Sequence, residues 1–146
     1  MPHINAAGLA LIEEFEGCEL TAYPDPGTGG APWTIGYGHT GPEVHPGMTI
    51  TQEQAVTYLQ ADVATAEQAV ASLVEVVLTP NQFSALVSFQ YNTGCLDGST
   101  MLRLINEENF AAAANEFALW VYGGGQMLPG LVRRRAAEKA LFEASS

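Results

Sequence analysis

A glycine- and proline-rich stretch between helical segments limits most strongly what this chain can fold into. Residues 18–47 hold five of the eight prolines and seven of the fifteen glycines, together with short β-prone pieces such as "WTIGY". Glycine and proline interrupt helices and favour turns, so this stretch predicts a small, hairpin-rich sheet. The chain before and after it follows helical patterns, so the sheet is expected as an insertion after the first helix.

The flanking helices are marked by apolar spacing and by capping residues. Apolar positions from Ile4 to Phe15 recur at helical intervals, and Gly17 is the residue expected just past a helix end. After the glycine-rich stretch, Thr51 and Gln54 have the spacing of a capping box, which predicts a helix through about residue 73.

The rest of the chain repeats these signals. Thr79, Pro80 and Gln82 predict a second capped helix, which Gly94 ends. Shorter helices are expected over 100–107 and 110–120, and a last one from Pro129 after a loop "GGGQML".

The length of 146 residues suits one compact domain. We therefore expect a single α+β domain over 1–146. Its predicted parts are a β lobe at about 18–47, a connecting helix at about 51–73, and a helical lobe made of about 1–16 plus 79–146.

Charge is distributed unevenly along the chain. Residues 1–102 contain eleven acids and no Lys or Arg, whereas residues 103–146 contain five of each sign, and the formal net charge is -11. Binding to phosphate needs clustered cations, so nucleic acid and anionic membranes are poor partners. No apolar run reaches the roughly 18–20 residues of a membrane span, so no membrane insertion is expected.

The first residues and the two cysteines bear on the cellular compartment. The start lacks the basic and apolar regions of a signal peptide, so synthesis is expected to end in the cytoplasm. Cys18 and Cys95 are too few for a disulfide scaffold, and we expect free thiols. The three histidines have no paired spacing typical of zinc, so neither a metal nor a cofactor is expected.

Two acids stand at the border of the first helix and the glycine-rich stretch. Cleavage of a glycosidic bond commonly uses one protonated and one ionised carboxyl group. Glu16 suits the donor, because a helix end and neighbouring acids disfavour its negative charge. Asp25, between two prolines in a turn, suits the ionised partner. By spacing alone, both fit ordinary surface acids as well.

The motifs around these acids resemble the phage-type lysozymes, the T4 and lambdoid-phage endolysin family (glycoside hydrolase family 24). The family signature has "EG" at the end of a helix, then "AYxD", then "TIGYGHT". In this sequence these are Glu16-Gly17, Ala22–Asp25 and Thr34–Thr40. The likeness continues through "LTPNQFSALVSFQYNTG", "STMLRLIN" and "LPGLVRRRAAEKALF", in the family's order.

The resemblance implies a catalytic triad in which Glu16 is the general acid, Asp25 orients or activates the attacking water, and Thr34 helps to hold that water. Eight residues separate Asp25 from Thr34, a longer gap than is usual in the family. The extra residues predict a longer hairpin tip, and a changed turn can alter the strand register. The family resemblance also implies a structural salt bridge between His39 and Asp62.

The same resemblance implies substrate-binding residues. Gly38 would let a sugar approach the backbone, and Phe89 and Gln90 would face the sugar from the other side, although Phe89 fits a core aromatic equally well. Trp120 is expected in the core. One of the three consecutive arginines is expected to reach Glu16, and the other two are expected on the surface: Arg133, Arg134 and Arg135.

The function implied is that of an endolysin-type muramidase, a glycoside hydrolase that cuts the β-1,4 bond between N-acetylmuramic acid and N-acetylglucosamine in bacterial peptidoglycan. It would be a monomer that is made in the host cytoplasm and reaches the wall with the help of a holin or another membrane-permeabilising partner. Three alternatives remain open: a lytic transglycosylase on the same scaffold, a non-catalytic wall-binding module, and a chitosanase, since an acidic surface suits a cationic polymer.

Overall fold

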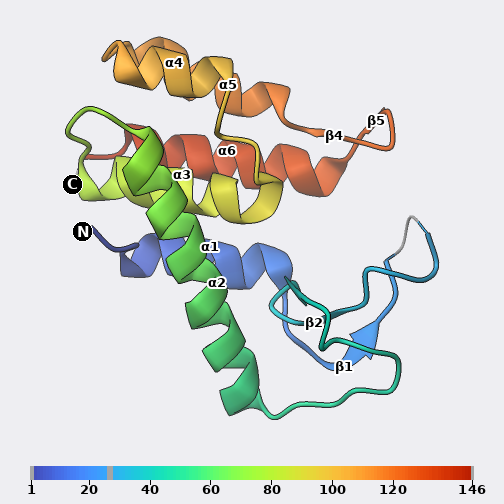
Figure 1. The fold of residues 1–146 in the computed structure, drawn as a ribbon. Helices are drawn as coiled ribbons and strands as arrows, with labels where there is room; N and C mark the ends of the chain where they lie inside the picture. Colours follow the sequence, from blue (N-terminus) through green and yellow to red (C-terminus); the bar gives the residue numbers. More distant parts are fainter. Residues whose placement is uncertain (1, 26–27, 146) are drawn as a thin grey trace. The chain divides into compact units, whose positions relative to one another are not determined.

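A computed structural model describes residues 2–25 and 28–145 (Figure 1). The chain divides into two compact units. Unit 1 comprises Met1–Leu11 and Thr65–Ser146, and unit 2 comprises Ile12–Ala64. Unit 1 is therefore discontinuous in the sequence, and unit 2 is inserted into it.

Unit 2 contains a small antiparallel sheet that follows helix α1 (Ala6–Glu16). Its strands are β1 (Glu19–Tyr23), β2 (Thr34–Gly36) and β3 (His39–Thr40), in that spatial order. The register pairs Tyr23 with Thr34 and Ile35 with His39. A small apolar core supports the sheet and consists of Ala22, Ile35 and Val44 with Trp33, Met48 and Ile50 against them.

Helix α2 (Gln52–Leu73) begins in unit 2 and continues into unit 1. Its first turn carries the predicted capping box: the Thr51 N–H donates to Gln54 Oε1 (2.8 Å), and the Gln54 N–H donates to Thr51 Oγ1 (3.1 Å). These two bonds satisfy amide groups that have no partner inside the helix, which is why the helix begins here.

The rest of unit 1 is mainly helical. Helix α3 (Pro80–Thr93) has the predicted capping box of Thr79 and Gln82, and Gly94 ends it with a left-handed φ of 62°. Helices α4 (Thr100–Asn106) and α5 (Phe110–Glu116) begin at the side-chain caps Ser99 and Asn109. A short 3-10 turn, η1 (Phe117–Leu119), follows α5, and the last helix is α6 (Pro129–Glu143).

The core of unit 1 lies around α3, where residues 83–89 are all buried. Helix α6 packs along α3, and α4 packs against α5 (Figure 1). Aromatic rings fill the space between them in edge-to-face pairs, with Phe89 against Phe117 at 5.7 Å and against Trp120 at 5.3 Å between ring centroids.

One predicted loop is wrong. The "GGGQML" segment forms a short hairpin of β4 (Tyr122–Gly123) and β5 (Gln126–Met127). Gly124 and Gly125 form its turn with φ angles of 59° and 80°. Two consecutive positive φ angles match the twist of a two-residue hairpin, and glycine reaches them without strain. The predicted α+β class is confirmed, because the helices are accompanied by small antiparallel sheets.

Candidate functional site

Glu16 and Gly38 are in contact within unit 2. Glu16 is the last residue of α1, and its side chain is half-buried. Gly38 has a left-handed φ of +79°, and a Cβ atom on it would lie 2.5 Å from Oε1 and 3.1 Å from Cδ of Glu16. The carboxyl group of Glu16 therefore occupies the space that any other residue at position 38 would need.

Asp25 lies two residues after the end of β1, and Thr34 is the first residue of β2. The Asp25 backbone N–H donates to the Gly30 carbonyl (2.9 Å), and its Oδ2 accepts from the Thr28 N–H (3.1 Å). Thr34 pairs with Tyr23, two residues before Asp25. The longer gap between Asp25 and Thr34 is thus compatible with their meeting at the same end of the hairpin. Residues 26 and 27 of this gap lie outside the described residues.

The pKa of Tyr23 responds to acidic side chains near the predicted catalytic residues. Burial, and then the carboxylates of Glu16 and Glu19, raise the pKa of Tyr23 above its usual value of 10.0. By sequence, unit 2 carries eight Asp and Glu and no Lys or Arg. Unit 2, which contains the predicted catalytic residues, therefore has a formal charge of -8.

His39 is held by two carboxylates. Its Nδ1 lies 2.7 Å from Asp62 Oδ2, which confirms the predicted pair, and its Nε2 lies 2.5 Å from Glu43 Oε1. Burial lowers the pKa of His39, but the hydrogen bonds to Glu43 and Asp62 outweigh burial, and the pKa lies above the usual 6.5. The bond to His39 lowers the pKa of Glu43. Sequence reasoning missed Glu43, and its spacing of four residues from His39 was the only available signal.

Phe89 and Gln90 belong to unit 1. The Phe89 side chain has no exposed surface, as expected for a core aromatic. Gln90 is partly exposed, and its Oε1 accepts the Leu96 N–H (3.1 Å), which ties the loop after α3 to that helix. Trp120 packs edge-to-face on Phe89 but is only partly buried, so it lies at the border of the core rather than inside it.

Two of the three consecutive arginines are buried, so the expectation of two surface cations is wrong. Arg134 and Arg135 have exposed fractions of 3% and 1%, and both bind the fully buried Glu138. Ser88 Oγ donates to the same carboxylate (2.6 Å), and the Arg135 guanidinium lies 5.2 Å from the Phe89 ring centroid. The i, i+3 and i, i+4 spacing lets one carboxylate on α6 pair with both cations. Neutral acceptors hold the rest of each guanidinium: Arg134 donates to the Ser88 carbonyl (3.2 Å) and Arg135 to the Trp120 carbonyl (2.9 Å).

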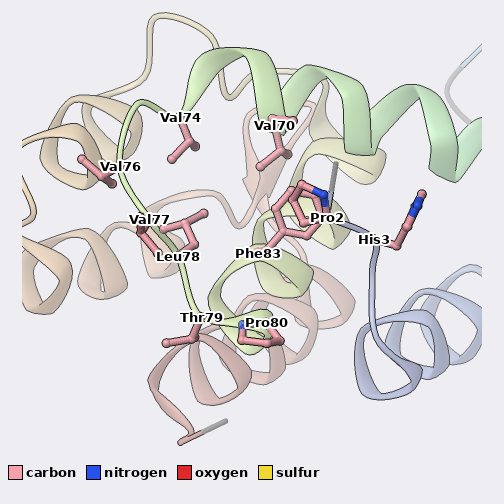
Figure 2. Close-up of a pocket in the computed structure, with 11 residues that line it drawn as sticks. Pro2, His3, Val70, Val74, Val76, Val77, Leu78, Thr79, Pro80 and Phe83 are labelled. Carbon is pink, nitrogen blue, oxygen red and sulfur yellow. The ribbon is translucent and has the colours of Figure 1, made fainter.

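An apolar pocket of about 530 Å³ lies in unit 1 (Figure 2). Its walls come from the end of α2, the segment after it and the start of α3, and they include Val70, Val74, Leu78 and Phe83. None of the predicted site residues lines this pocket. Among the described residues that line it, His3 alone carries a titratable side chain.

The part of the chain that the structure describes has no cluster of His, Cys, Asp or Glu suited to a metal ion. No helix within the described ranges is both long and apolar enough to cross a membrane. Cys18 and Cys95 are free, as predicted.

A mixed fold with a small sheet after the first helix, and an acid at the end of that helix, defines a class of lysozyme-like proteins. The family model described as "Phage lysozyme" matches residues 13–138. The chain therefore belongs to the phage lysozyme family.

Relatives agree with this assignment. The chain is 45% identical over 142 residues to an endolysin of Bacillus phage B103, covering 96% of this chain and 54% of that protein. It is 42% identical over 151 residues to the endolysin of Salmonella phage P22, covering 97% and 99%. The chain spans 54% and 56% of the first two curated relatives, so these are nearly twice its length.

Solved structures agree as well. The muramidase domain of SpmX from Asticaccaulis excentricus matches with a TM-score of 0.89 and 38% identity, covering 99% of this chain and all of that one. A mutant of P22 lysozyme matches with a TM-score of 0.83 and 38% identity over 99% of this chain. The fold is therefore that of the lysozymes.

Proposed function

We propose that this protein is an endolysin-type muramidase, a glycoside hydrolase that cuts the β-1,4 bond between N-acetylmuramic acid and N-acetylglucosamine in bacterial peptidoglycan. Membership of the phage lysozyme family supports this function. The single structural observation that carries it is the carboxyl group of Glu16 at the end of α1, held against Gly38 in the same unit as Asp25 and Thr34.

In the proposed reaction, Glu16 donates a proton to the glycosidic oxygen as the bond to the leaving sugar breaks. The Asp25 carboxylate activates a water molecule that attacks the anomeric carbon and accepts the proton that this water loses, and Thr34 helps to hold the water. The pairing of Tyr23 with Thr34 supports this assignment, because it brings Thr34 to the strand end that precedes Asp25.

The remaining roles are proposed from the family resemblance. Residues 1–146 would act as one lysozyme-like domain, with Gly38 and Gln90 lining the glycan. Phe89, predicted as a third substrate-binding residue, has a fully buried side chain and takes no part in this contact. One of the three arginines would reach Glu16. The protein would be a monomer, made in the host cytoplasm, and it would depend on a holin or similar partner to reach the wall.

The test is product analysis on purified peptidoglycan with matched variants. Glu16→Gln keeps the shape of the side chain but cannot donate the proton, so the rate should fall by roughly 10²- to 10⁴-fold. Glu14→Gln removes the same charge from an exposed position of the same helix and should remain active. Asp25→Asn should be severe, and Thr34→Ala milder.

Mass spectrometry separates the alternatives. Hydrolysis gives reducing ends, and a transglycosylase gives anhydro-muramyl ends that lack one water. Anhydro ends together with a fully active Asp25→Asn would make the transglycosylase correct. Folded protein that pelleted with walls without releasing fragments would indicate a wall-binding module. Preferential cleavage of chitosan would point to the chitosanase.

A further inference from the structure

His39 joins three parts of unit 2 through one imidazole ring. Asp62 on α2 contacts Nδ1, and Glu43 in the loop after β3 contacts Nε2. The ring of Tyr58, also on α2, stacks on the imidazole at 4.1 Å between centroids and an interplanar angle of 17°. The His39 side chain is only 11% exposed. Both nitrogens and one face of the ring are therefore occupied.

The backbone of His39 borders the predicted catalytic residues. Its neighbour Gly38 is the residue against which the Glu16 carboxyl lies. The ladder of β2 and β3 pairs His39 with Ile35 and the next residue, Thr40, with Thr34. A shift of His39 would therefore move both the surface that supports Glu16 and the strand that carries Thr34.

The charge state of His39 decides how firmly the ring is held. An imidazole donates from both nitrogens only when it is protonated, and carboxylates only accept. Two carboxylates therefore fix the charged ring from opposite sides. After loss of a proton, one nitrogen presents a lone pair to a carboxylate, and that bond is lost. The groups in contact with the ring are Asp62 and Tyr58 on α2 and Glu43 in the loop, and Glu16 lies against the neighbouring Gly38.

We propose that Glu43 and His39 form a positioning pair for the general acid, in which Glu43 orients the charged imidazole and the imidazole fixes the Gly38 backbone against Glu16. The pair with Asp62 alone could hold the ring by one nitrogen. Glu43 adds the second bond, which prevents rotation of the ring about the first. The reaction served is the one proposed above, so the catalytic part of this inference rests on that function.

The kinetic test compares Glu43→Gln with Glu53→Gln, which removes one negative charge from an exposed position at the start of α2 in the same unit. On soluble peptidoglycan fragments, Glu43→Gln should lower kcat by about 10-fold, less than the roughly 10²-fold cost of a full 1 Å misplacement. KM should change little.

The pH profile gives a readout that lost stability alone would not move. Glu43 raises the pKa of His39, so its removal should shift the part of the alkaline limb of kcat that follows His39 to lower pH. Glu53→Gln should leave the limb in place. An unchanged kcat and an unchanged limb in Glu43→Gln would overturn the proposal.

A second measurement needs no turnover and so separates this inference from the proposed function. In NMR titrations of the wild type, the Gly38 amide and the Glu16 side-chain carboxyl resonances should follow the titration of His39. In Glu43→Gln the titration and both resonances should move together to lower pH. Independence of these resonances from His39 would refute the positioning role even in an active enzyme, and coupling would support it even if no hydrolysis were found.

Discussion

The contact between Gly38 and Glu16 predicts that Gly38→Ala separates activity from stability. The new methyl group would lie 2.5 Å from Glu16 Oε1, whereas ordinary contacts begin at 3.4 Å. The carboxyl group must therefore retreat by about 1 Å. A displacement of that size at a reacting group can cost about 10²-fold in rate, and this is the loss expected in kcat.

The stability cost is smaller and has a different origin. Glu16 Oε1 is the end of a flexible side chain, so its displacement costs little folding free energy. The left-handed φ of +79° remains, and a residue with a Cβ atom at this φ lowers the free energy of unfolding by about 1–2 kcal/mol. For a chain of this size each kcal/mol corresponds to a fall in Tm of about 2–4 °C.

Gly47 supplies the matched control. It has a φ of +83° in the same unit, and a Cβ atom there would meet no atom within 4 Å. Gly47→Ala should thus lose a similar amount of stability and keep its activity. Thermal melts followed by circular dichroism and initial rates on peptidoglycan fragments measure the two effects. Equal rates in the two variants, at temperatures where both are folded, would refute the idea that the Gly38 contact positions the acid.

Three further predictions concern charge. The His39–Glu43 pair should stabilise the fold most between pH 4.5 and 6.5, the usual pKa values of Glu and His. Its contribution falls as pH rises through the raised pKa of His39, or as pH drops through the lowered pKa of Glu43. In thermal melts, the Tm of His39→Ala should therefore depend less on pH than the Tm of the wild type. Glu138→Leu leaves Arg134 and Arg135 buried without their carboxylate and should cost about 3–5 kcal/mol in denaturant unfolding; a loss below 1 kcal/mol, roughly that of a surface pair, would contradict this. Because unit 2 is acidic and walls carry carboxylates, activity on intact walls should rise as salt is added from about 0.01 M, where charges act over about 30 Å, to about 0.15 M, where they act over about 8 Å. A neutral chitooligosaccharide should show little salt effect, and a steady fall with salt on walls would mean that exposed cations of unit 1, such as Arg103 and Arg133, meet the polymer.

Elements set by local chemistry were predictable from the sequence. The capping boxes at Thr51 and Thr79 involve residues three apart, so their spacing identifies the helix starts without knowledge of the fold. The pair of His39 and Asp62 was predicted from the family resemblance. The hairpin of β4 and β5 was missed because each strand has two residues, too few for an alternating pattern.

The charged contacts beyond these were not predictable. A carboxylate such as Glu138 looks like a surface residue in the sequence, and only the packing of α6 on α3 shows that it is buried with two arginines. Glu43 lies in a loop, where a spacing of four residues does not by itself bring side chains together. The contact of Glu16 with Gly38 depends on the path of the chain between them.

The insertion of unit 2 into unit 1 sets an order for folding during synthesis. Unit 2 is one continuous segment and can form its contacts once residue 64 has left the ribosome. Unit 1 must close long loops, since the Ile4 N–H bonds to Glu67, 63 residues away, and the Asn5 N–H to Ser84, 79 residues away. Closing loops of this length lowers the conformational entropy of the chain, and only the contacts of the complete helical unit offset that loss. The segment with the predicted catalytic residues can therefore acquire its structure while the unit that flanks it is still incomplete, and for that period its exposed acids help to keep the nascent chain from aggregating.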